Sequence, residues 1–222
     1  TDGDADRFGI IDEDGTYIEP NYIIALLLDY LVRVRGIQGG VARSVATSHL
    51  IDAVAAHHGI QVYETPVGFK YIGELISQDK IVIGGEESAG LTIRGHVPEK
   101  DGILACFLVA EMVAREGLSV RAQLERLYAR VGRYLTRREN ITLSPALEEA
   151  FPDKLRAAPD RFAGLAVKEL ITLDGNKFIM EDGSWLLFRK SGTEPVVRLY
   201  VEAADEVRLQ ALQKAGREFI LS

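Results

Sequence analysis

The sequence has little of several features that mark special classes of protein. Its 222 residues include one cysteine, Cys106, so no internal disulfide can form. It contains no uncharged apolar run of about 18 residues, the length that predicts a membrane-spanning helix. Acidic residues outnumber basic ones, 33 to 26, and the formal net charge of -7 argues against general nucleic-acid binding, which needs a basic surface. We therefore expect a cytoplasmic protein with neither a membrane nor a nucleic-acid partner.

The residues that are present are typical of an ordinary globular chain. Hydrophobic residues make up 47% of the sequence and charged residues 27%, a balance that allows a sizeable core. The length suits one large or two modest domains. Cys106 lies in the apolar run 103–109 and is more simply a core residue than a nucleophile.

Segments typical of helices and strands alternate along the first part of the chain. In order, we expect a helix over 21–35, a strand over 41–47, a helix over 50–58, a strand over 60–64, a helix over 69–78 and a strand over 80–84. Such alternation predicts an α/β fold with a parallel sheet, in which the loops after the strands gather along one edge. These loops are 47–49, 65–68 and 85–90, and we expect them to share a rim.

The second part of the chain has a different pattern. Two further helices are expected over 102–115 and 120–130, with Gly117 as a stop and Ser119 as a cap. After Gly132 the signals change to a strand-like segment over 133–143, a polar helix, hairpin turns at 174–175 and 182–183, and a final amphipathic helix over 205–219. They predict a second, smaller α+β domain from residue 131 onward.

The chain begins with an acidic loop, in which Asp2, Asp4 and Asp6 alternate with small residues before Arg7. Hard cations such as Mg2+ prefer oxygen ligands, and Gly3 allows a short turn to aim several carboxylates at one point. Three negative charges this close repel one another unless a cation neutralises them. The segment therefore predicts a Mg2+ site, and the alternative is a frayed acidic terminus.

Two other kinds of acidic site fit this segment less well. Acids at positions 2, 4, 6 and 13 match part of an EF-hand calcium loop, but Arg7 stands where that loop needs glycine. An aspartyl-phosphate phosphatase also uses an Asp-x-Asp loop, but that loop follows directly after a buried hydrophobic strand, and this sequence shows no such strand before Asp2. Because a metal loop needs an element that enters it, and nothing precedes Thr1, we expect the chain to be the back part of a longer protein.

A phosphate loop is predicted at residues 189–195, Arg-Lys-Ser-Gly-Thr-Glu-Pro, between two apolar runs. A guanidinium, two hydroxyls and the backbone amides exposed by a glycine can converge on the oxygens of one phosphate. The residues predicted to bind it are Arg189, Ser191, Gly192, Thr193 and Arg198. The alternative is a hairpin turn with polar decoration.

A third segment, the glutamate loop, covers residues 84–90, Gly-Gly-Glu-Glu-Ser-Ala-Gly, directly after an expected strand. The carboxylates, such as that of Glu86, accept hydrogen bonds from vicinal sugar hydroxyls, and the glycines permit close approach of a ligand. Ser88 adds a hydroxyl. A solvated acidic loop or a helix cap explains the segment about as well.

Taken together, the three loops resemble the α-D-phosphohexomutase family, the phosphoglucomutases and phosphomannomutases, over essentially the whole chain. In that family four domains surround a cleft and each contributes one loop: a phosphoserine loop, a Mg2+ loop of the type Asp-Gly-Asp-x-Asp-Arg, a sugar loop of the type Gly-Glu-x-Ser and a phosphate loop of the type Arg-x-Ser-Gly-Thr-Glu-Pro. This sequence matches the last three.

The resemblance implies roles for the residues that match. The three aspartates would bind Mg2+, and Arg7 would lie against the transferring phosphoryl group. Glu86 and Ser88 would hold sugar hydroxyls, and the 189–193 segment would grip the phosphate that is not transferred. The wording of the glutamate loop favours glucose phosphates over mannose or glucosamine phosphates.

The family's phosphoserine loop, Thr-Ala-Ser-His-Asn-Pro, has no counterpart in this sequence. Ser48 lacks the Asn-Pro continuation and follows the metal loop instead of preceding it, so we interpret it as a helix N-cap. The resemblance then implies that residues 1–17 end domain 2, residues 18–130 form domain 3 and residues 131–222 form domain 4. The missing amino-terminal domains would be partners of this part.

Several further groups could complete the cleft. Thr65, Gly68 and Lys70 belong to the second rim loop or follow it, and we predict that they contact substrate. His96 and Lys100 lie in a segment that also resembles the family, and they are predicted as phosphate or proton-transfer partners, with ordinary surface charge as the alternative.

The family resemblance implies an enzyme that moves a phosphoryl group between C1 and C6 of a hexose phosphate, through a phosphoserine and a bisphosphorylated intermediate. Without the serine loop, this chain alone would be inactive. The alternatives are a non-catalytic phosphosugar-binding protein and a Mg2+-dependent phosphosugar phosphatase.

Overall fold

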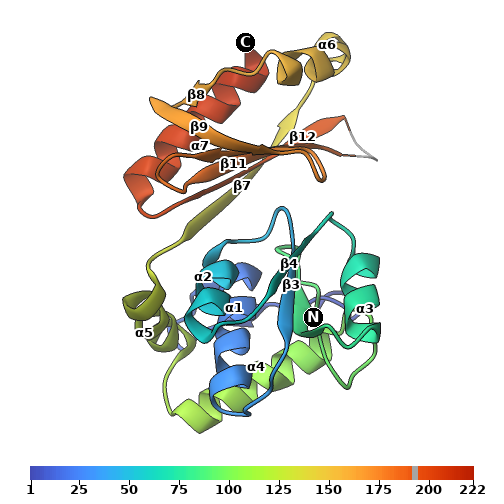
Figure 1. The fold of residues 1–222 in the computed structure, drawn as a ribbon, viewed down its shortest axis with the longest axis vertical. Coiled ribbons are helices and arrows are strands. Elements are labelled where there is room, and N and C mark those ends of the chain that lie inside the picture. Colours follow the sequence, from blue (N-terminus) through green and yellow to red (C-terminus); the bar gives the residue numbers. More distant parts are fainter. Residues whose placement is uncertain (192–194) are drawn as a thin grey trace. The chain divides into compact units, whose positions relative to one another are not determined.

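The computed structural model describes residues 1–191 and 195–222, and the chain divides into a first unit, residues 1–133, and a second unit, residues 134–222 (Figure 1). The first unit contains β1 (Ile10–Ile11), β2 (Tyr17–Ile18), α1 (Pro20–Arg33), β3 (Gly40–Ser44), α2 (Leu50–His58), β4 (Val62–Thr65), α3 (Phe69–Ser77), β5 (Ile81–Gly85), β6 (Leu91–Ile93), α4 (Gly102–Glu116) and α5 (Val120–Val131). The second unit contains β7 (Leu135–Thr142), α6 (Pro145–Arg156), β8 (Arg161–Phe162), β9 (Leu165–Ile171), β10 (Asn176–Met180), β11 (Trp185–Lys190), β12 (Val196–Ala203) and α7 (Glu206–Leu221).

The main sheet of the first unit has the strand order β4-β3-β5-β6. β3 pairs in parallel with both β4 and β5, which confirms the predicted α/β fold, and β6 joins the edge antiparallel to β5. Figure 1 shows α1 and α2 on one side of β3 and β4, and α3 on the other. β6 and the β1–β2 hairpin were not predicted, because strands of two or three residues show no periodicity.

The helix ends of the first unit follow ordinary capping chemistry. Gly117 ends α4 with a left-handed backbone, and the Ser119 side chain accepts a hydrogen bond from the backbone of α5, as predicted. The Ser48 prediction is wrong by one position. His49 is the cap residue of α2, while the buried Ser48 Oγ accepts the backbone N–H of Leu50 at 3.0 Å.

The second unit is a six-stranded antiparallel sheet in the order β7-β12-β11-β10-β9-β8. The two hairpins around β10 turn at the predicted Asp-Gly pairs, where Gly175 and Gly183 both have positive φ. One face of the sheet packs against α7 through a core that includes Phe178, Leu186 and Leu199. This unit confirms the predicted α+β character.

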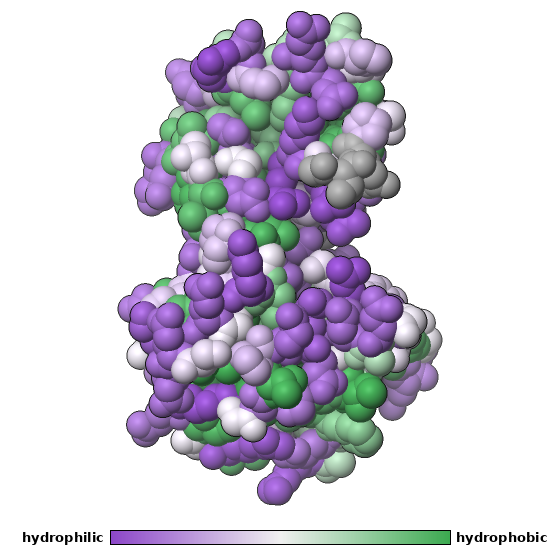
Figure 2. Space-filling model, turned by 90° about the vertical axis from the view of Figure 1, so that its right-hand side faces the viewer, coloured by the Kyte–Doolittle hydropathy of each residue, from purple (hydrophilic) through white to green (hydrophobic). Residues whose placement is uncertain are grey.

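Surface chemistry agrees with the composition. Hydrophilic side chains cover most of the face seen in Figure 2, with hydrophobic residues in small separate areas. Cys106, expected in the core, is only partly buried. In the described parts of the chain no helix is both long and apolar enough to cross a membrane.

Candidate functional site

The acidic loop closes on itself. The backbone N–H of Arg7 donates to Asp2 Oδ1 at 3.3 Å, and the N–H of Ala5 donates to the Asp2 carbonyl at 3.2 Å. Ala5 adopts a left-handed backbone with φ 59°, a conformation that costs about 1–2 kcal/mol for a residue with a side chain. Strain of this kind persists only where the surrounding structure holds it in place, and it is typical of functional loops.

The acidic loop lies directly on the start of α4. The N–H of Gly102 donates to the Ala5 carbonyl at 3.0 Å, and a Cβ at position 102 would come within 2.4 Å of the Arg7 carbonyl oxygen. Only glycine allows this approach. The start of α4 therefore fixes where the acidic loop lies in the first unit.

The glutamate loop packs beside the acidic loop. Its turn is closed by hydrogen bonds between the backbones of Glu86, Ala89 and Gly90, and Ala89 also has a left-handed backbone, with φ 74°. The N–H of Phe8 donates to the Ala89 carbonyl at 3.3 Å. The acidic loop and the glutamate loop, far apart in the sequence, are thus hydrogen-bonded neighbours.

The three loops that follow the parallel strands meet, as predicted. The backbone N–H of Gly68 donates to Glu86 Oε1 at 2.8 Å, and the N–H of Glu87 donates to Thr47 Oγ1 at 3.2 Å. Glu86 is buried, with 4% of its surface exposed, so it joins two loops. Ser88 is partly exposed on the same turn.

Lys100 lies at the junction of these loops. Its Nζ is 3.4 Å from Asp6 Oδ2 and 3.0 Å from Glu99 Oε1, and it lies 5.3 Å from the centre of the Phe69 ring. Its methylene groups pack on Gly90, where a Cβ would come within 2.7 Å. Partial burial alone would lower the pKa of Lys100, but the Glu99 and Asp6 carboxylates raise it above its ordinary value, so Lys100 is charged.

His96 is tied to the loop that precedes α4. Its Nε2 lies 2.7 Å from Asp101 Oδ2, and Asp101 also accepts the backbone N–H of Leu104 as the cap of α4. The backbone hydrogen bond from Leu104, assisted by His96, lowers the pKa of Asp101. This arrangement orients His96, and its predicted role with phosphate or a proton stays a prediction.

The remaining residues of the second rim loop have mixed surroundings. Thr65 is buried and its hydroxyl donates to the Pro66 carbonyl at 3.0 Å. Gly68 has φ 138°, which a side chain would not favour. Lys70 is exposed, with its Nζ 4.8 Å from the centre of the Tyr71 ring. Gly68 therefore has the firmest structural connection to the site, through Glu86.

The acidic loop does not present a formed metal cage. Asp2 and Asp4 are exposed, and Asp6 faces Lys100. Within residues 1–191 and 195–222, no group of three or more His, Cys, Asp or Glu side chains is arranged to hold a metal ion. The carboxylates suit Mg2+ in their chemistry, but in this conformation they do not fit it in their geometry.

In the second unit, two arginines of the predicted phosphate site are cross-strand neighbours. Arg189 on β11 pairs with Arg198 on β12, which pairs in turn with Asn140 on β7, so the three side chains lie on one face of the sheet. The core residues Phe188 and Leu199 alternate with them and lie on the face toward α7. The arginine row, Arg189 and Arg198, therefore occupies the face that α7 does not cover.

This arginine row is electrostatically costly on its own. Like charges directly opposite each other destabilise a sheet. Among the described residues, Arg198 Nε is a buried nitrogen with no hydrogen-bond partner. Ser191, at the end of β11, is buried and its N–H donates to the Val196 carbonyl at 2.9 Å. Gly192 and Thr193 lie outside the described residues.

Two residues that the sequence pattern did not indicate as site residues, Asp101 and Asp174, support these sites. Asp101 precedes an apolar helix, so the N-cap pattern could have indicated it. Asp174 was identified only as a turn residue, but its Oδ2 accepts from Arg189 Nε at 2.9 Å. That contact depends on the pairing of β10 with β11, which the sequence does not display directly.

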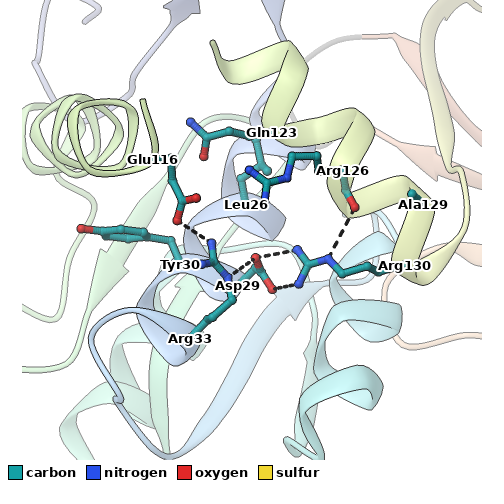
Figure 3. Close-up of a pocket in the computed structure, with 9 residues that line it drawn as sticks. All are labelled: Leu26, Asp29, Tyr30, Arg33, Glu116, Gln123, Arg126, Ala129 and Arg130. Carbon is teal, nitrogen blue, oxygen red and sulfur yellow. Dashed lines mark hydrogen bonds and ion pairs between the residues drawn. The ribbon is translucent and has the colours of Figure 1, made fainter. Parts of the chain in front are cut away.

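A separate pocket of about 340 Å3 in the first unit lies between α1, the end of α4 and α5 (Figure 3). At its floor, Asp29 accepts hydrogen bonds from Arg130 at 2.8 and 3.1 Å and from Arg33 at 3.3 Å, and His58 Nε2 lies 2.8 Å away. Arg33 also binds Glu116 at 2.6 Å. We name this ion network the Asp29 hub, and its charges are largely used in joining helices.

Comparison with known proteins gives concordant results for both units. The family model for phosphoglucomutase/phosphomannomutase, alpha/beta/alpha domain III, matches residues 19–131, and the model for the C-terminal domain of the same family matches residues 144–218. The chain is 31% identical over 218 residues to a phosphoglucomutase/phosphomannomutase of Thermococcus kodakarensis, covering 97% of this chain and 45% of that protein.

Two further proteins extend the likeness. A Pyrococcus abyssi protein assigned as a phosphoglucosamine mutase is 33% identical over 220 residues, which cover 99% of this chain and 47% of the relative. The crystal structure of a Thermus thermophilus protein assigned as a phosphomannomutase superposes with a TM-score of 0.84 at 34% identity, covering 100% of this chain and 45% of that one. The chain thus spans about half the length of the curated relatives it matches.

Proposed function

The chain belongs to the phosphoglucomutase/phosphomannomutase family, and we propose that it is the carboxyl-terminal part of a phosphohexomutase. The complete protein would move a phosphoryl group between C1 and C6 of a hexose phosphate, through a phosphoserine and a bisphosphorylated sugar. The serine would come from a part of the protein beyond this chain. The coverage of about 45% to 47% of the relatives supports this division.

One observation carries the proposal most strongly. The acidic loop and the glutamate loop are joined by the Phe8–Ala89 hydrogen bond, and Lys100 lies beside both. A loop suited to a transferring phosphoryl group is thus adjacent to a loop suited to sugar hydroxyls. A hexose phosphate needs both chemistries within the length of one sugar.

The residues of the first unit would divide the work as follows. Arg7, exposed at the end of the acidic loop, would contact the transferring phosphoryl group. Lys100, whose Nζ is 3.4 Å from Asp6 Oδ2, would hold its positive charge near the same oxygens. Glu86 and Ser88 would bind sugar hydroxyls, and the Glu86–Gly68 bond would keep the second rim loop against the sugar.

The residues of the second unit would hold the phosphate that is not transferred. A phosphate monoester carries close to two negative charges, which would offset the repulsion between Arg189 and Arg198. It would also give the buried Arg198 Nε an acceptor. Ser191 directly follows the strand that carries Arg189, and its hydroxyl would add a further hydrogen bond to the phosphate.

We propose Mg2+ as the cofactor because it prefers oxygen ligands such as the carboxylates of the acidic loop. A distant structural neighbour at 16% identity, the N-acetylphosphoglucosamine mutase of Aspergillus fumigatus, was crystallised with GlcNAc-6P and magnesium. Asp2, Asp4 and Asp6 are the residues that would hold the ion. Calorimetric titration of the chain with Mg2+, with Asp4→Asn as comparison, tests it: we expect binding that the substitution weakens, and equal heats would reject the site.

The proposed function is tested by joining this chain with the amino-terminal half of its complete protein. We expect conversion of glucose 1-phosphate to glucose 6-phosphate by the joined protein and none by this chain alone. Turnover by the chain alone would contradict the proposal. Binding without conversion by the joined protein would favour a phosphosugar-binding protein, and net phosphate release would favour a phosphatase.

A further inference from the structure

Arg189, the β11 member of the arginine row, binds a carboxylate from another turn of the sheet. Its Nε donates to Asp174 Oδ2 at 2.9 Å, and the two side chains are 19% and 26% exposed. Asp174 lies in the turn between β9 and β10. A guanidinium bound through Nε keeps its two terminal nitrogens available on the opposite edge of the plane.

The backbone of this turn is built against the arginine. A Cβ at position 175 would come within 2.5 Å of the Phe188 carbonyl oxygen and 3.3 Å of the Arg189 Cα. Gly175 also has φ 91°, which a side chain would not favour. The Asp174-Gly175 turn can therefore approach the Arg189 backbone closely and bring the carboxylate to Nε.

The space around Arg189 is open on another side. A cavity of about 430 Å3 in the second unit is bordered by Asp174, Arg189 and Lys190. Lys190 is paired with Glu148 at 2.8 Å, so the glutamate already compensates its charge. Without the Asp174 bond, the repulsion from Arg198 would favour rotamers in which Arg189 points away from its cross-strand neighbour.

We infer that Asp174 is a positioning residue for phosphate recognition: it holds the Arg189 guanidinium so that its terminal nitrogens face the same phosphate as Arg198. This inference rests on the proposed function of Arg189. It assigns a role in affinity to the β9–β10 turn, which lies outside the 189–195 motif. Asp174 itself, being anionic, would not contact the phosphate.

The chain contains a matched control in the next turn of the same sheet. Asp182 also precedes a glycine with positive φ, and it also pairs with an arginine, Arg208, at 3.3 Å. Arg208 belongs to α7 and is not part of the arginine row. Asp182→Asn therefore removes the same charge from the same kind of turn.

The test measures binding of glucose 6-phosphate and of inorganic phosphate to the 222-residue chain by NMR titration. Asp174→Asn is expected to weaken both affinities by about tenfold, because Arg189 would no longer be held in place for its charge-assisted contact with the phosphate. It should also shift the Arg189 Nε–H resonance and speed its exchange with water. Asp174→Glu is expected to restore part of the affinity, and Asp182→Asn to leave it unchanged.

The outcomes separate this inference from the function on which it rests. If Arg189→Ala abolishes binding but Asp174→Asn leaves it unchanged, the positioning role is wrong and the phosphate site stands. If the unsubstituted chain does not bind, or Arg189→Ala binds normally, the phosphate site itself is wrong. Equal losses for Asp174→Asn and Asp182→Asn would indicate a general effect of altering an Asp-Gly turn of this sheet and would overturn the inference.

Discussion

The Asp29 hub and the arginine row both concentrate guanidinium groups, but their charges are balanced in different ways. In the hub, the buried Asp29 carboxylate pairs with the guanidinium groups of Arg130 and Arg33 (Figure 3). His58 Nε2 also lies 2.8 Å from this carboxylate, so the two arginines are paired within the fold. In the row, Arg189 and Arg198 are opposite each other on neighbouring strands, and Asp174 binds Arg189. Paired cations of the first kind join helices, whereas cations of the second kind favour an anionic ligand.

The first prediction breaks the hub. Asp29→Ala leaves Arg130, Arg33 and His58 without their shared carboxylate, and breaking a buried ion pair costs about 3–5 kcal/mol. We expect the first unit to unfold at a lower urea concentration, and far-ultraviolet circular dichroism measures this transition. Trp185, the sole tryptophan, lies in the second unit, and its fluorescence transition should not move.

Two outcomes would contradict this prediction. If Asp29→Ala lowers the Trp185 transition as much as the circular dichroism transition, the hub does more than join the helices of the first unit. If neither transition moves, the hub does not stabilise the first unit, and its pocket becomes a candidate ligand site. Glucose 6-phosphate binding by the folded variant should remain unchanged.

The second prediction breaks the row. Arg198→Met keeps the apolar stem but removes the charge, and we expect glucose 6-phosphate affinity to fall by about tenfold or more. The free energy of unfolding should stay the same or rise by up to about 1 kcal/mol, because a like-charge pair is lost. Calorimetry and urea unfolding measure the two effects separately.

The control for Arg198 lies on a neighbouring strand. Arg137 on β7 faces α7 and binds Glu206 at 2.7 Å, so Arg137→Met removes one positive charge from the other face of the sheet. It should leave glucose 6-phosphate affinity unchanged. A loss of affinity as large as that of Arg198→Met would mean that net charge, and not the row, attracts the phosphate.

The third prediction concerns backbone strain in the glutamate loop. Ala89 has φ 74°, and a β-branched residue fits this conformation poorly, so Ala89→Val should destabilise the first unit by about 1–2 kcal/mol. Ala89→Gly should be nearly neutral, since relief of strain is offset by greater unfolded-state entropy. Thermal unfolding of the two variants measures the difference, and equal midpoints would contradict a strained loop.

The fourth prediction is the smallest and uses pH. Burial alone would raise the pKa of Asp29, but hydrogen bonds from Arg130 and His58 outweigh it, so the folded pKa lies below the ordinary 3.8. The stabilisation is therefore present above pH 3.8 and is lost as the pH falls through the folded pKa. The difference in thermal midpoint between the parent and Asp29→Asn should narrow in that acidic window, and a constant difference would contradict it.

Much of the fold could be predicted because its elements are long and periodic. The helix at 50–58 and the turns at Asp174-Gly175 and Asp182-Gly183 follow from spacing and turn chemistry alone. β6 and the β1–β2 hairpin are too short to show a period. Their place is set by tertiary pairing, such as that of β6 with β5.

The candidate site was predictable as residue types but not as contacts. Motif spacing indicated Arg189, Arg198 and the glutamate loop, yet the cross-strand pairing of the two arginines depends on register. Lys100 was predicted as a possible partner of phosphate, but its approach to Asp6 requires the fold of the 98–102 segment. The Asp29 hub was missed, because its members come from helices whose packing the sequence does not specify.

An NMR titration of the chain with glucose 6-phosphate, mapped residue by residue, tests the proposed phosphate and sugar sites most directly. We expect shifts at Arg189, Ser191 and Arg198 and at the glutamate loop, and none at the Asp29 hub. Shifts confined to the hub, or no saturable shifts at all, would contradict it.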